Sequence, residues 1–64
     1  MKIRKERIGP DSPLFQKNCG NFTQIRLVAV FKDGKELPIV QFFGLQAKIL
    51  SESVIKQFGW KITN

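Results

Sequence analysis

Two runs rich in β-branched and aromatic residues dominate the middle of the chain. They cover about residues 22–31 and 36–43 and are separated by Asp33-Gly34. Such side chains favour β-strands. Asp-Gly is a preferred pair for a two-residue type I′ turn, because both central positions of that turn need a positive φ. The pattern therefore predicts a β-hairpin that turns at Asp33-Gly34.

The predicted turn also fixes which residues face each other. A two-residue turn pairs Leu27 with Val40 and Ala29 with Pro38. With that register both faces of the hairpin are mostly apolar, whereas a sheet with one solvated face alternates apolar and polar residues. The polar exceptions lie near the open end of the hairpin: Gln24, Arg26 and Gln41. We therefore expect both faces to need cover.

Pro38 limits where a further strand can pair. In the predicted register Pro38 falls in a non-hydrogen-bonded pair, so its missing N–H would face away from the first strand. A neighbouring strand on that side would lose a hydrogen bond. The second strand is thus predicted to be an edge at Pro38, and any added strand should pair with residues 22–31 or beyond Pro38.

The residues after Gly44 allow two interpretations. Four apolar residues recur at helical spacing and favour a single helix: Ala47, Leu50, Val54 and Phe58. Alternatively, residues 45–50 form a short strand, and a helix capped by Ser51 follows. Both interpretations place a helix over at least 51–58 and end it at Gly59. Residues 60–63 would then form a short strand or an extended tail.

The N-terminal region is strongly basic. Residues 1–7 contain four of the eleven basic residues and one acid, which is half of the net charge of +6. We interpret them as a mobile basic arm or a short edge strand. Residues 8–21 are interrupted by glycine and proline and predict an irregular segment, anchored by Leu14 and Phe15. The predicted organisation is a basic arm over 1–7 and one small α+β domain over 8–64, with an antiparallel sheet built on the hairpin and one C-terminal helix.

The length and composition exclude several classes of protein. A chain of 64 residues has room for one small core. The lone Cys19 cannot form a disulfide within the chain, and without histidine a zinc site is not expected, so we predict no metal and no cofactor. There is no apolar run of about 18 residues for a membrane span, and the basic start lacks the apolar run of a secretory signal. A cytoplasmic protein with no membrane partner is expected.

Catalytic chemistry is also not expected. Histidine is absent, and nothing in the pattern brings the five acidic residues together. Cys19 lacks a histidine to activate it, and no phosphate-binding glycine loop occurs. We therefore predict that the protein is not an enzyme.

The apolar hairpin predicts association with another chain. One short helix can cover only one face of a two-stranded hairpin, which is marginally stable on its own. The other face, or the open edge of the first strand, would then meet a partner, and a homodimer is the commonest solution. The candidate interface residues are Ile25, Leu27, Val40 and Phe42. The alternative is a monomer in which residues 8–21 supply a third strand.

Two functions fit these features. The first is a small, basic, non-enzymatic and regulatory nucleic-acid-binding protein, acting as a dimer, whose cations contact the phosphate backbone. The candidate contacts lie on the arm and at the hairpin tip: Lys2, Arg4, Lys5, Arg7, Lys32 and Lys35. The second is a protein–protein interaction module or inhibitor that uses the apolar face or strand edge of the hairpin, with an acidic protein as partner.

Overall fold

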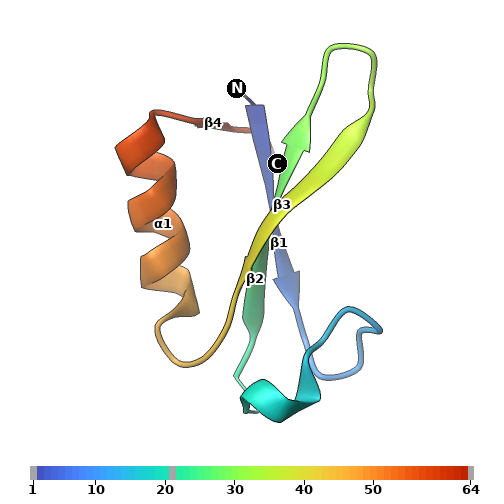
Figure 1. Ribbon diagram of the computed structural model, residues 1–64, viewed down its shortest axis with the longest axis vertical. Helices are drawn as coiled ribbons and strands as arrows, with labels where there is room; N and C mark the ends of the chain where they lie inside the picture. The colour runs from blue at the N-terminus through green and yellow to red at the C-terminus, as the bar shows by residue number, and fades with distance from the viewer. Residues whose placement is uncertain (1, 21, 64) are drawn as a thin grey trace.

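The fold is α+β, as predicted, and combines a mixed sheet with a C-terminal helix (Figure 1). The computed structural model describes residues 2–20 and 22–63, apart from the side chain of Cys19. In this part of the chain four strands lie in the order β3-β2-β1-β4. The elements in sequence order are β1 (Lys2–Ile8), the 3-10 turn η1 (Lys17–Cys19), β2 (Gln24–Val30), β3 (Glu36–Phe42), α1 (Ala47–Phe58) and β4 (Lys61–Ile62).

The basic N-terminal residues form strand β1. It pairs antiparallel with β2 from Lys2 opposite Val30 to Ile8 opposite Gln24. Its first two residues also pair in parallel with β4. The mobile arm over 1–7 is therefore wrong for the described residues 2–7, which belong to the same sheet as the hairpin. The strand alternative is right, but β1 is an edge only beyond its pairing with β4.

Two isoleucines explain why so charged a segment forms a strand. Ile3 and Ile8 are both buried, and their odd and even positions place them on opposite faces of the sheet. Each face therefore gains one apolar anchor. The four residues between them, at positions 4–7, are all charged and conceal this pattern in the sequence.

The predicted hairpin is confirmed, but its turn is longer than expected. The N–H of Phe31 donates to the carbonyl of Lys35 at 2.9 Å, and the N–H of Gly34 donates to the carbonyl of Phe31 at 3.0 Å. Gly34 has a φ of 88°. A left-handed glycine at the last position of a three-residue loop is a common hairpin connection. The two-residue type I′ turn is therefore wrong.

The longer turn shifts the register near the tip by one residue. Val28 faces Pro38 and Ala29 faces Leu37, whereas Leu27 faces Val40 as predicted. The two registers meet at a β-bulge, in which Ile39 is the extra residue of β3. The bulge restores the predicted alternation towards the open end of the hairpin.

Strand β3 lies at the edge of the sheet, as Pro38 predicts, and the added strand β1 joins the side of β2. The physical reason for the edge position is the missing N–H of the proline, which cannot donate to a neighbouring strand.

After Gly44 the chain forms a single helix. Ser51 lies inside α1 and is fully buried, and its hydroxyl donates to the carbonyl of Lys48 at 2.9 Å. The alternative of a strand followed by a helix capped at Ser51 is therefore wrong. Gly59 ends the helix as predicted, with a φ of 66°. Its N–H donates to Lys56, and that of Trp60 donates to Ile55, which is a Schellman arrangement.

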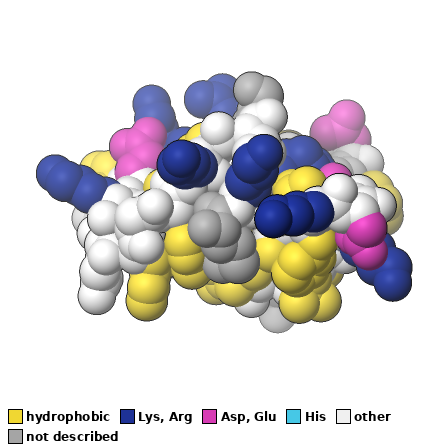
Figure 2. Space-filling view, turned by 90° about the horizontal axis from the view of Figure 1, so that it is seen from above, with side chains coloured by type: hydrophobic (Ala, Val, Ile, Leu, Met, Phe, Trp, Pro, Cys, Tyr) yellow, Lys and Arg dark blue, Asp and Glu magenta, His cyan; other side chains and the backbone are white. Residues whose placement is uncertain are grey.

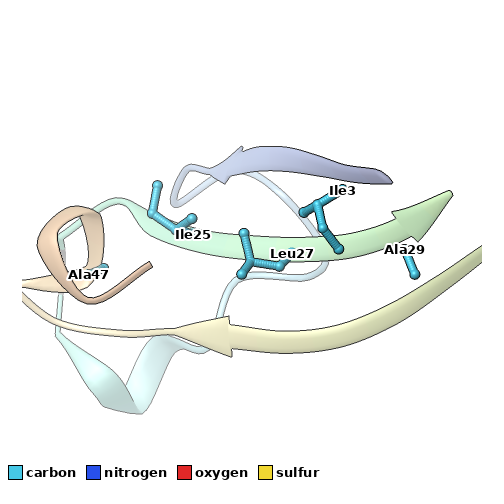
Figure 3. Close-up of a cluster of buried hydrophobic side chains, with 5 residues drawn as sticks. All are labelled: Ile3, Ile25, Leu27, Ala29 and Ala47. Atoms are coloured by element: carbon cyan, nitrogen blue, oxygen red, sulfur yellow. The ribbon is translucent and has the colours of Figure 1, made fainter. Parts of the chain in front are cut away.

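The core lies between the sheet and α1. Figure 3 shows buried side chains along β1 and β2, with Ile25 nearest to Ala47 at the start of the helix and Ile3 and Ala29 farther along the sheet. The buried cluster consists of Ile3, Ile25, Leu27, Ala29 and Ala47. Phe42, Val54, Ile55 and Trp60 pack against it. Ile25 and Leu27 were predicted as interface residues, but α1 and β1 already cover them, so they are not available to a partner. Val40 and Phe42 remain partly exposed.

Side chains and the segment after β1 cover the open-end half of the sheet face that points away from α1. Near the open end, Gln24 is fully buried. Its side-chain oxygen accepts from the backbone N–H of Gln16 at 3.0 Å, and its side-chain nitrogen donates to the backbone carbonyl of Gln16 at 2.9 Å. Gln41 donates to Gln24 at 2.8 Å. Phe15, the predicted anchor of the irregular segment, is buried, whereas Leu14 is partly exposed. The segment after β1 thus shelters this half without forming a third strand.

The Ser51 position gives a stability prediction. We expect Ser51→Ala to change the free energy of unfolding by less than about 1 kcal/mol, because an interior alanine has a higher helix propensity and the lost hydrogen bond is to the helix itself. Chemical denaturation checks this, with the solvent-exposed Ser53→Ala as the matched control. A loss well above about 1 kcal/mol relative to the control would instead indicate a capping role.

Candidate nucleic-acid interface

The six predicted contact residues do not form one surface. β1 carries four of them, and strand alternation sends Lys2 and Arg4 to the face away from α1, while Lys5 and Arg7 lie on the helix side. Lys32 and Lys35 flank the hairpin tip. Eight of the eleven basic residues fall into an ion-paired group and two clusters at opposite ends of β1. Lys17, Lys35 and Lys56 belong to none of these groups.

The ion-paired group consists of Arg4, Glu6, Arg26 and Glu36, here called the arginine–glutamate network. Arg4 contacts Glu36 at 2.6 Å and Glu6 at 3.2 Å, and Arg26 contacts Glu6 at 2.8 Å. Arg4 lies directly opposite the buried Val28, so the network covers the tip half of the face that α1 leaves open. Arg4 thus has a structural role, and its charge is balanced within the sheet.

The network also sets the protonation of Glu6. Burial alone would raise the pKa of its carboxyl group. Hydrogen bonds from Arg26 and Arg4, together with their positive charges, outweigh burial and lower the pKa below its ordinary value of 4.5. Glu6 therefore stays ionised while the network is intact.

The first cluster lies at the hairpin-tip end and is called the tip cluster. Lys2, Lys32 and Lys61, with Val30 and Phe31, line an open hollow of about 380 Å³. The sheet brings them together because Lys2 pairs with Val30 on one side and with Lys61 on the other. Phe31 remains 48% exposed. Figure 2 views the molecule from this end, and Lys and Arg side chains gather across it beside exposed hydrophobic side chains.

The tip cluster differs from the predicted site in two ways. Among the described residues that line the hollow, no side chain is acidic. Lys35 does not line it; its ammonium group lies 3.9 Å from the Asp33 carboxylate and is largely solvated. Prediction missed Lys61 and Phe31, because β4 is only two residues long and its parallel pairing with β1 leaves no sequence signal.

The second cluster lies at the start of α1 and is called the helix-start hollow. Lys5, Arg7 and Lys48 line a space of about 230 Å³ together with Phe22 and Leu45. Lys5 also contacts Glu52 of the helix at 3.4 Å. Lys5 and Arg7 were predicted contacts, whereas Lys48 and Phe22 come from other parts of the chain and were not.

Comparison with known proteins gives no relative: no family model, no curated protein and no solved structure matches the chain. No helix in the described part of the chain has the length and hydrophobicity needed to span a bilayer.

The low pKa of Glu6 predicts a pH-dependent stability. Its ion pairs contribute fully above the ordinary pKa of 4.5, and this contribution is lost as the pH falls through the lower pKa of the folded state. We expect Glu6→Gln to cost about 1–2 kcal/mol at neutral pH, between the values for exposed and buried pairs. The deficit should shrink as the pH falls below the ordinary pKa of 4.5 and through the lower pKa of the folded state.

Denaturation of both proteins across this pH range provides the measurement. Glu52→Gln, which alters a more exposed ion pair, is the control and should cost less at neutral pH. A Glu6→Gln deficit that is independent of pH would contradict the electrostatic account.

Proposed function

We propose that the protein is a small, non-enzymatic, regulatory nucleic-acid-binding protein that engages single strands through the tip cluster. The observation that carries this proposal is the convergence of Lys2, Lys32 and Lys61 around the exposed ring of Phe31. Lysines neutralise phosphates, and an exposed aromatic ring stacks an unpaired base. Nothing in the lining of this hollow, as far as the chain is described, repels a phosphate.

The combination favours single strands over duplexes. Phosphate contacts alone bind both forms, because both carry a negatively charged phosphate backbone. A base can reach the face of Phe31 only when it is unstacked, as in a single strand or a loop. Arg7 and Lys35 lie outside the tip cluster and contribute long-range attraction.

The net charge supports the same assignment. The two arginines and two glutamates of the network cancel, so the excess of +6 resides on other residues. Those residues include the three tip lysines, which line one hollow. An oligonucleotide would thus be attracted to the cations outside the network.

Variants of the tip cluster test the proposal by their salt dependence. Lys32→Gln combined with Lys61→Gln should weaken binding of a short single strand and reduce the slope of log affinity against log salt by about 1.4, because each lost phosphate contact removes about 0.7. Fluorescence anisotropy over a salt series, with DNA and RNA strands, measures both quantities. Lys17→Gln is the control, and an unchanged slope in the double variant would refute the assignment.

Phe31 tests the stacking contact separately. Phe31→Leu keeps the charge and should lower single-strand affinity about tenfold while leaving the salt slope unchanged. Duplex affinity should change little. Phe58→Leu, at an exposed phenylalanine of α1 outside the proposed contact surfaces, is the matched control. Equal losses for single and double strands would show that Phe31 does not stack a base.

A second candidate function, association with another protein chain, rests on a different observation. Edge strand β3 and the residue after it expose four apolar side chains: Leu37, Ile39, Val40 and Phe43. Soluble monomers seldom expose contiguous apolar patches of large area. We propose that a second copy of the chain packs against the exposed edge of the sheet at β3, which gives the homodimer expected from the sequence.

Sedimentation at low and high protein concentration tests the dimer. The wild-type protein should shift from monomer to dimer, and Val40→Lys should remain monomeric, because a buried ammonium group has no partner at an apolar interface. Ile49→Lys, on the outer face of α1, is the control. A wild-type protein that stays monomeric at high concentration would exclude this second function as a homodimer.

A further inference from the structure

The helix-start hollow has a composition suited to a small anionic ligand. Three cationic side chains from two elements converge on it: Lys5 and Arg7 from β1 and Lys48 from α1. Among the described residues that line it, none is acidic. The hydroxyl-bearing Thr23 also lines the hollow and offers a hydrogen-bond donor. This hollow is separate from the tip cluster, with which it shares no residue.

Apolar surface adjoins the cations. Phe22 is 51% exposed and Leu45 is 77% exposed, although both line the hollow. Exposed apolar side chains beside a cationic group suit a ligand with a flat ring and a charged end.

We propose that the helix-start hollow binds a phosphomonoester attached to a ring, as in a nucleoside monophosphate. The phosphate lies among Lys5, Arg7 and Lys48, and the ring rests on Phe22 and Leu45. The guanidinium group of Arg7 suits this ligand, because its planar donors match phosphate oxygens in pairs.

The charge of the hollow matches a phosphomonoester better than a phosphodiester. A phosphomonoester carries about −1.5 to −2 at neutral pH, whereas each backbone phosphate of a nucleic acid carries one negative charge. Glu52 contacts Lys5 from outside the hollow and offsets part of its charge. Arg7 and Lys48, with a share of Lys5, then balance a group that is close to doubly charged.

The size of the hollow also favours a single phosphomonoester over a nucleic-acid strand. Its volume of about 230 Å³ is below the roughly 300–1,000 Å³ of pockets for drug-sized ligands. It accommodates one phosphate and part of one ring rather than a run of nucleotides. The phosphomonoester therefore belongs either to a free nucleotide or to the 5′ end of a strand.

Titration with adenosine monophosphate tests the site by NMR. Gly44, Leu45, Ala47 and Lys48 line the hollow, and their backbone amide signals should shift saturably. Adenosine, which lacks the phosphate, should bind at least about tenfold more weakly, because it forms no charged hydrogen bonds. Inorganic phosphate should shift the same amides with lower affinity than the nucleotide. Equal binding of adenosine and its monophosphate, or no saturable shift, would overturn the proposal.

Substitutions of opposite expected effect make the test specific. Lys48→Gln should weaken binding of the nucleotide about tenfold. Lys56→Gln, which makes the same charge change two turns later on α1, is the matched control. Glu52→Gln should strengthen binding by a few-fold, because it removes a carboxylate that competes for Lys5. Equal effects of Lys48→Gln and Lys56→Gln, or weaker binding in Glu52→Gln, would refute the site.

Strands with and without a 5′-phosphate identify the source of the ligand. Tighter binding of the phosphorylated strand, lost in Lys48→Gln, would assign the site to strand ends. Nucleotide binding without such a preference would assign it to free nucleotides. Because the nucleotide titration involves no strand, failure of the tip cluster to bind nucleic acid leaves this result unaffected.

Discussion

The antiparallel pairing of β1 with β2 supports both the core and the candidate sites. It places Ile3 beside Ala29 in the cluster under α1, and it brings Glu6 opposite Arg26, where the two side chains form an ion pair. It also sets Lys2 beside the end of β2, next to the hairpin tip. Without this pairing β2 would lose its neighbour on one side, and a bare two-stranded hairpin is only marginally stable in water.

The arginine–glutamate network covers part of the apolar face of the hairpin that α1 leaves open. α1 is a single helix and covers one face of the sheet, so the other face needs a cover of its own. Arginine side chains have long aliphatic stems that pack over apolar residues while the charged ends remain hydrated. Arg4 on β1 lies opposite Val28, and Arg26 precedes Val28 by two residues on β2. Glu6 and Glu36 hold the two arginines by ion pairs. A charged layer therefore replaces the second helix or third apolar strand that a small chain lacks.

Local sequence patterns predict most of the fold, and the failures have physical causes. The hairpin, the edge position at Pro38, the helix over 51–58 and its end at Gly59 follow from propensity and backbone geometry, and all are confirmed. The turn length was wrong because a glycine with positive φ suits both two- and three-residue loops. The prediction left β1 open between a mobile arm and a short edge strand, because only Ile3 and Ile8 carry its apolar signal.

The candidate sites were harder to predict, because they depend on pairing between distant segments. Lys2, Lys32 and Lys61 come from three elements, and only the sheet order brings them together. Arg4 is the kind of residue that contacts phosphates, but in the fold it is paired with Glu6 and Glu36. The number of charges along the chain cannot distinguish a cation that is free to contact phosphate from one that is ion-paired, since both are basic residues in a basic segment.

The parallel pairing of β4 with β1 ties the two described ends of the chain to each other. The link is short: Lys61 and Ile62 pair with Lys2 and Ile3, and the N–H of Thr63 donates to the carbonyl of Ile3 at 2.9 Å. So small an element opens at little cost in free energy. A polyanion held between Lys2 and Lys61 would bind only the closed form and would stabilise it by mass action. If the tip cluster binds a polyanion as proposed, binding would therefore hold the first and last described strands together.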